Sequence, residues 1–190
     1  MMKKIAIFAS GNGTNAENIC NYFINNKNID VVLLSTNKKT AFVVERIKKF
    51  NVPVFSFSKE ELNNTTIVQK KLLEYSVDLI VLSGFLLRVP KNVVSLFPDK
   101  IINIHPSLLP KFGGRGMYGK NVCKSVIDAK ETQSGITVHY VNSNYDEGNI
   151  IFQEKFTLPK NETLEGLLEK IKALEMRFFP VIIEKVINSL

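Results

Sequence analysis

Short apolar runs alternate with amphipathic stretches through the first half of the chain. Each apolar run has the length and composition of a buried strand, and polar or glycine-containing turns bound it. The runs that predict strands lie at residues 3–9, 31–35, 54–57, 78–83 and 101–105. Helical patterns fall between them, at 16–23, 41–50, 66–75 and 90–97, with a capping box of Ser58 and Glu61 at a further helix start. This alternation is typical of βαβ units and predicts a doubly wound α/β fold with a parallel sheet.

The pattern changes after Pro110. Residues 111–119 hold four glycines and predict a loop, and residues 120–129 predict a helix. Two stretches, 134–141 and 149–156, alternate like antiparallel strands, and the tail at 162–188 has helical spacing that Pro180 is expected to kink or break. We therefore expect one domain over residues 1–190: a mostly parallel sheet with flanking helices and an antiparallel C-terminal addition.

Composition excludes several classes of partner. The net charge of +7 makes anionic ligands plausible, but the lysines are scattered and no nucleic-acid motif accompanies them. No apolar run is long enough to span a membrane, and the N-terminus has no signal-peptide pattern. Cys20 and Cys123 fall in helical patterns without metal-ligand spacing. We expect a cytoplasmic protein with reduced thiols, no metal, and neither nucleic acid nor membrane as a partner.

A polar pair closes the fifth predicted strand. Because side chains alternate along a strand, Asn103 and His105 point to one face, and Pro106 then stops the hydrogen-bonding ladder. Ligands of open α/β sheets bind outside the carboxyl ends of strands. A single histidine there can be a satisfied structural residue, but the chain has only two, His105 and His139. The pair is therefore a candidate catalytic site.

A second polar stretch lies downstream. Thr137 and His139 share one face of a predicted strand, and the following turn contains Asp146. An acid in a turn is usually solvated. If the turn folds towards His105, however, Asp146 is placed to orient the imidazole or to raise its basicity.

The third candidate is a glycine loop between the first strand and the first helix. Gly11-x-Gly13-x-x-Ala16 loosely matches a dinucleotide fingerprint, but no acid ends the second strand, which argues against NAD. Two interpretations remain. The N–H groups of Gly13, Thr14 and Asn15 form a phosphate cradle at a helix N-terminus, or the segment is only a tight turn. In the first case a side chain at Gly13 is expected to crowd the phosphate.

Together these segments resemble the folate-dependent formyltransferases. The resemblance rests on Asn103 to Pro110, on Asp146-Glu147-Gly148, and on the loop Ser10 to Asn15, and it covers essentially the whole chain. The loop is similar to that of members acting on glycinamide ribonucleotide. The implied reaction transfers a formyl group from the co-substrate N10-formyltetrahydrofolate to the amine of glycinamide ribonucleotide, in purine biosynthesis.

The resemblance also implies roles for individual residues. Asn103, His105 and Asp146 match the catalytic trio, Gly13, Thr14 and Asn15 match the phosphate loop, and Thr137 and His139 match a supporting strand. The implied folate-binding residues are Phe85, Leu86, Leu87, Arg88, Val89, Val141, Asn142 and Tyr145. Many relatives carry the arginine one place earlier than Arg88. The alternatives are a formyltetrahydrofolate hydrolase, a transferase with another amine acceptor, or a non-catalytic binding module. We expect small-molecule partners and a monomer or homodimer.

Overall fold

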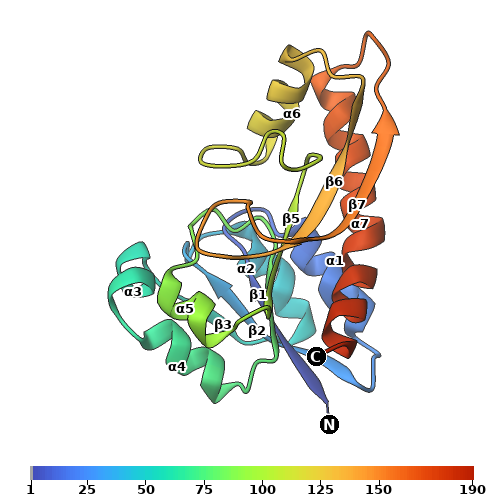
Figure 1. Ribbon diagram of the computed structural model, residues 1–190. Coiled ribbons are helices and arrows are strands. Elements are labelled where there is room, and N and C mark those ends of the chain that lie inside the picture. Colours follow the sequence, from blue (N-terminus) through green and yellow to red (C-terminus); the bar gives the residue numbers. More distant parts are fainter. Residues whose placement is uncertain (1) are drawn as a thin grey trace.

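One seven-stranded sheet runs through the computed structural model, which describes residues 2–190 (Figure 1). Its strands are β1 (Lys3–Phe8), β2 (Ile29–Thr36), β3 (Val54–Ser56), β4 (Leu79–Leu82), β5 (Ile101–His105), β6 (Gln133–Tyr140) and β7 (Ile150–Thr157). The spatial order is β3-β2-β1-β4-β5-β6-β7. The first five strands are parallel, whereas β6 pairs antiparallel with β5 and β7 with β6. The predicted fold class is confirmed.

Helices cover both faces of this sheet (Figure 1). One face packs against α1 (Thr14–Phe23), α2 (Phe42–Ile47) with its 3₁₀ extension η1 (Lys48–Phe50), α6 (Lys120–Asp128) and α7 (Leu164–Asn188). The other packs against α3 (Lys59–Asn64), α4 (Ile67–Glu74) and α5 (Lys91–Leu96). The alternation along β1 divides its apolar residues between the two cores: Ile5 and Ile7 face the first, Ala6 and Phe8 the second.

The prediction that Pro180 breaks the last helix is wrong. Helix α7 is continuous through Pro180, which is buried. A proline in a helix cannot donate to the carbonyl four residues earlier, here that of Met176. The Asn18 side chain of α1 supplies the missing donor, with its Nδ2 at 2.7 Å from the Met176 oxygen. A contact between two helices therefore replaces the bond that proline removes.

Two features of the sheet bring the candidate residues to one edge. The order of the strands reverses between β1 and β4, so the chain leaves their adjacent carboxyl ends in different directions. Ser10 ties these two ends together: its N–H donates to the Gly84 oxygen at 3.1 Å, and its hydroxyl accepts the Leu86 N–H at 2.9 Å. Next to them, the antiparallel register of β5 and β6 sets Asn103 opposite His139 and His105 opposite Thr137. Among residues 2–190, no helix is long and apolar enough to cross a membrane.

Candidate active site

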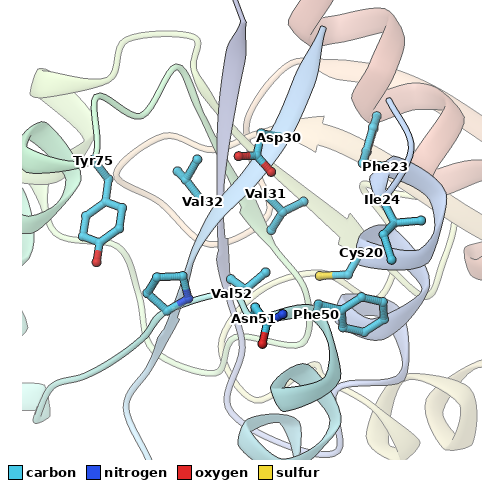
Figure 2. A pocket seen from close by; sticks show the side chains of 11 residues that line it. Cys20, Phe23, Ile24, Asp30, Val31, Val32, Phe50, Asn51, Val52 and Tyr75 are labelled. Carbon is cyan, nitrogen blue, oxygen red and sulfur yellow. The ribbon is translucent and has the colours of Figure 1, made fainter. Parts of the chain in front are cut away.

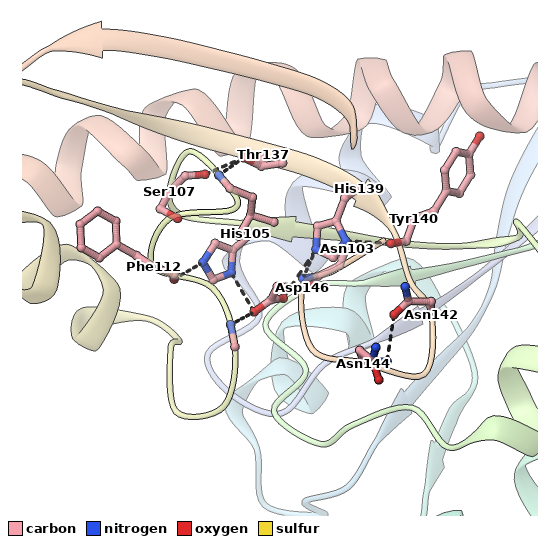
Figure 3. A network of polar contacts seen from close by, with 12 residues as sticks. Asn103, His105, Ser107, Phe112, Thr137, His139, Tyr140, Asn142, Asn144 and Asp146 are labelled. Atoms are coloured by element: carbon pink, nitrogen blue, oxygen red, sulfur yellow. Dashed lines mark hydrogen bonds and ion pairs between the residues drawn. The ribbon is translucent and has the colours of Figure 1, made fainter. Parts of the chain in front are cut away.

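Asp146 lies between the two histidine rings (Figure 3). Its Oδ2 is 3.7 Å from His105 Nδ1, and its Oδ1 is 3.6 Å from His139 Nε2. The same carboxylate accepts the Gly114 N–H at 2.9 Å. Asp146 holds a left-handed backbone conformation with φ of 55°, which is uncommon for a residue other than glycine and is concentrated at functional sites. The turn after β6 thus folds back onto the end of β5.

Hydrogen bonds define which nitrogen of each histidine carries a proton. His105 Nε2 is 2.8 Å from the Phe112 carbonyl oxygen, and His139 Nδ1 is 2.8 Å from that of Tyr140. Because a carbonyl oxygen can only accept, both of these nitrogens are donors. In the neutral rings, His139 Nε2 is then an acceptor, and the Asn103 amide donates to it at 3.1 Å. His139 therefore orients the Asn103 side chain, and the second N–H of the Asn103 amide stays free.

The surroundings shift the titration of His105 and Asp146 in defined directions. Burial lowers the pKa of His105 below its ordinary value of 6.5, and the Asp146 carboxylate offsets only part of that effect. Burial alone would raise the pKa of Asp146. The neighbouring His139 and His105 rings and the Gly114 N–H outweigh it, so the pKa of Asp146 lies below its ordinary value. Asp146 is therefore ionised at neutral pH beside an imidazole that is reluctant to take a proton.

Thr137 supports the backbone of this site. It is fully buried, and its hydroxyl donates to the Ser107 oxygen at 2.6 Å while accepting the Leu109 N–H at 3.0 Å. Gln153 adds a third bond to the same hydroxyl at 2.8 Å. Thr137 thus holds the turn that follows His105. The Ser107 hydroxyl is itself committed to the Lys111 oxygen, so it is structural.

A cleft of about 60 Å³ opens beside Asn103, His139 and Asp146. Of the expected folate residues, all but one line it: Phe85, Leu87, Arg88, Val89, Val141, Asn142 and Tyr145. Leu86 is the exception, since it is not among the lining residues. Asn144, in the same turn as Asn142, also lines the cleft, as does Leu82 at the end of β4, which the sequence analysis did not single out. A larger cavity of about 430 Å³ lies along the amino-terminal half of β2, and no expected site residue lines it (Figure 2).

The glycine loop presents a row of free N–H groups. Helix α1 begins at Thr14, two residues earlier than the pattern predicts, with Gly13 at its N-cap. Within the described chain, none of the backbone N–H groups of residues 11–16 donates to another residue. A Cβ at Gly13 would lie 2.4 Å from Val43 Cγ2, on the α2 side, and the φ of Gly13 is 78°. A side chain at Gly13 therefore collides with α2, whereas the expectation that it would crowd a phosphate stays a prediction.

Glu175 completes this side of the site and was missed by the sequence analysis. It lies on α7, and its Oε2 accepts the Asn15 amide at 2.8 Å. Burial raises the pKa of Glu175 to about 7. The sequence did contain a signal: Glu175 falls between Ile171 and Phe179 at a spacing of four, on the apolar stripe of a helix. A carboxylate in that stripe indicates a special environment.

Known proteins identify the family of this site. A family model described as "Formyl transferase" matches residues 3–183. The chain belongs to the formyl transferase family. Phosphoribosylglycinamide formyltransferase of Bacillus subtilis is 35% identical over 192 residues, covering 98% of this formyl transferase and 96% of that protein. The chloroplastic enzyme of that name from Arabidopsis thaliana is 38% identical over 184 residues, covering 93% of this chain. The chain spans only 63% of that longer relative.

Solved structures of similar chains share the whole fold of this formyl transferase. Phosphoribosylglycinamide formyltransferase from Bacillus halodurans aligns with a TM-score of 0.86 and 36% identity, covering 97% of this chain and 95% of that one. Glycinamide ribonucleotide transformylase 1 from Geobacillus kaustophilus gives a TM-score of 0.89 at 32% identity, covering 98% and 100% of the two chains. In residues 2–190 of this formyl transferase, no cluster of His, Cys, Asp and Glu could hold a metal ion.

Proposed function

We propose that the chain transfers a formyl group from N10-formyltetrahydrofolate to the amine of glycinamide ribonucleotide. The observation that carries the proposal is the ionised Asp146 between two histidines, with Asn103 beside them and a free anion cradle at the same sheet edge. Relatives of similar length with this fold are named for that activity. We propose that residues 1–190 act as one domain, whose first half holds the phosphate and whose second half holds folate and the catalytic residues.

Asn103 and His105 supply the hydrogen bonds in this mechanism. Attack of an amine on a formyl carbon makes a tetrahedral carbon whose oxygen gains negative charge. The free N–H of Asn103 and the Nε2–H of His105 stabilise that oxygen, and one such donor is typically worth roughly 10²–10³ in rate. The His105 Nε2–H donates to the Phe112 carbonyl oxygen at 2.8 Å. The loop after β5 must therefore shift before His105 can reach substrate.

Asp146 transfers protons between the attacking amine and the folate nitrogen in this mechanism. The attacking nitrogen loses a proton as the new C–N bond forms, and the folate nitrogen gains one as its bond to the formyl carbon breaks. An ionised carboxylate next to the reacting atoms accepts the first proton, directly or through water, and returns it to the folate nitrogen as the bond to the formyl carbon breaks. Positioned acid–base groups typically contribute about 10²–10⁴ in rate.

The folate site in this proposal is the cleft beside Asn103. Its apolar lining by Leu82, Phe85, Val89 and Val141 suits a flat heterocycle, and Asn142 offers amide hydrogen bonds. Ligand sites of this kind usually hold about 300–1,000 Å³, far more than the 60 Å³ present here. Binding of folate therefore requires this cleft to widen.

The phosphate site in this proposal is the cradle at residues 11–16. Free N–H groups and the positive end of the α1 dipole favour an anion at this position. Asn15 and Glu175 lie next to it and can bind the hydroxyl groups of a ribose. One chain supplies every residue, so the site works in a monomer or in each subunit of a homodimer. The two free buried thiols support a reducing compartment, and we propose the cytoplasm.

Product analysis tests this function. The purified chain is incubated with both substrates, and the acceptor is examined by mass spectrometry. We expect one formyl group on the amine of glycinamide ribonucleotide, and the same amount of deformylated folate. Free formate with unmodified acceptor would contradict the proposal and indicate a hydrolase.

A further inference from the structure

Arg46, on α2, forms hydrogen bonds to the glycine loop at Asn12. Its Nε donates to the Asn12 backbone oxygen at 2.8 Å, and its Nη2 lies 3.2 Å from the Asn12 side-chain oxygen. Its Nη1 pairs with Glu17, in the first turn of α1, at 2.5 Å. The guanidinium also stacks 4.9 Å from the centre of the Phe42 ring. One side chain thus joins the loop, the start of α1 and the start of α2.

The hydrogen bond from Arg46 to the Asn12 carbonyl determines the direction of the Gly13 N–H, which belongs to the cradle. A peptide unit is planar and trans, so its C=O and the N–H of the next residue point in opposite directions. Arg46 holds the Asn12 carbonyl towards α2, and the Gly13 N–H is therefore directed away from α2. The preceding peptide is fixed in the same way, since Val43 N–H donates to the Gly11 oxygen at 3.1 Å. Contacts with α2 therefore hold the Gly11 and Asn12 carbonyls towards that helix, and the N–H groups of Asn12 and Gly13 point away from it.

Arg46 also offsets an unfavourable charge. Glu17 lies near the positive end of α1, where its carboxylate would oppose a second anion. Arg46 and Lys49 both pair with Glu17, at 2.5 and 2.6 Å. Lys49 touches the carboxylate but not the loop, and its side chain is 57% exposed against 25% for Arg46. The two cations therefore share the charge role, whereas Arg46 alone has the contact that orients the peptide.

We propose that Arg46 is a positioning residue for the phosphate of the acceptor substrate, acting through the Asn12 carbonyl. This inference rests on the proposed function, because that function places the phosphate in the cradle. Arg46 does not touch the phosphate in this account. Its planar fork holds the Gly13 N–H in the direction that an anion needs.

Two variants separate the peptide contact from charge. Arg46→Gln and Lys49→Gln each remove one positive charge and one ion pair with Glu17, but only the first removes the bond to Asn12. Ribose 5-phosphate is the probe, and its Kd is measured by calorimetry. We expect Arg46→Gln to weaken binding at least tenfold, equivalent to about 1.4 kcal/mol, and Lys49→Gln to change it less than twofold. In turnover, Arg46→Gln raises the KM for glycinamide ribonucleotide with kcat nearly unchanged.

Three results would overturn the inference: ribose 5-phosphate affinity within twofold of wild type in Arg46→Gln, equal losses in the two variants, or no binding of this probe to the wild type. Where Arg46→Gln does not fold, Arg46→Lys keeps the charge and the alkyl stem but lacks the fork, and affinity equal to wild type would also contradict us. Calorimetry needs no turnover. Failure of the proposed reaction with intact binding of the probe therefore remains distinguishable from failure of the Arg46 inference.

Discussion

Gly13→Ala is expected to destabilise the protein far more than an ordinary surface substitution. The new Cβ would lie 2.4 and 2.5 Å from Val43 Cγ2 and Cβ and 2.7 Å from Val43 Cα. The last of these is backbone, so a change of rotamer cannot relieve it. A left-handed φ costs an alanine roughly 1–2 kcal/mol, and overpacking typically adds about 1–3 kcal/mol. We therefore expect a loss of about 2–5 kcal/mol, against a typical total stability of 5–15 kcal/mol.

Gly84→Ala is the matched control for this prediction. Gly84 also has a positive φ, 66° against 78° at Gly13, but a Cβ there meets no atom within 4 Å. Gly84→Ala should therefore lose only the stability that a left-handed φ costs an alanine, roughly 1–2 kcal/mol. Urea unfolding followed by circular dichroism gives both values from the shift in midpoint at constant slope. Equal losses in the two variants would refute the reasoning, because α2 would then not be packed rigidly against the loop.

The remaining predictions concern the titratable groups of the site. His105→Ala is expected to lower kcat by about 10²–10³ while the Kd for N10-formyltetrahydrofolate stays within a few fold; an unchanged kcat would remove His105 from the mechanism. Asp146→Asn removes the charge that favours protonated His105, so an NMR titration should place the pKa of His105 even lower than in the wild type, and a rise would contradict the geometry. Glu175 binds its proton more tightly in the folded state, with a pKa of about 7 against an ordinary 4.5, so its contribution to stability is lost as the pH rises from 4.5 through 7. Glu175→Gln should therefore gain clearly more stability relative to wild type at pH 8 than at pH 5 in urea unfolding, and an equal difference at both pH values would show that the carboxyl is not buried in solution.

The sequence predicted those parts of the site that depend on local periodicity. Alternation along one strand put Asn103 and His105 on the same face, and β5 has that arrangement. The strand–helix alternation likewise predicted the sheet, because each buried strand is a continuous apolar run. The sequence left open whether Asp146 lies against His105. The position of Asp146 depends on its positive φ and on a turn that folds back across the sheet edge. Neither feature produces a periodic pattern in the sequence.

The hydrophobic pattern also could not predict contacts between residues on different helices and loops, for the same reason. Arg46 reads as an ordinary charged position on a short helix, and its contact with Asn12 requires α2 to pack beside the loop. Pro180 failed as a helix breaker because Asn18, from the other end of the chain, satisfies the orphaned carbonyl. Local rules describe what a segment prefers by itself, whereas these contacts are set by neighbours distant in sequence.

Deformylation of N10-formyltetrahydrofolate, followed by absorbance with and without glycinamide ribonucleotide, tests the central claim most directly. The account predicts release of deformylated folate only when the acceptor is present, in proportion to the acceptor added. Equal release without any acceptor would contradict the account, since water would then be the acceptor and the free N–H groups of the glycine loop would have no part in the reaction.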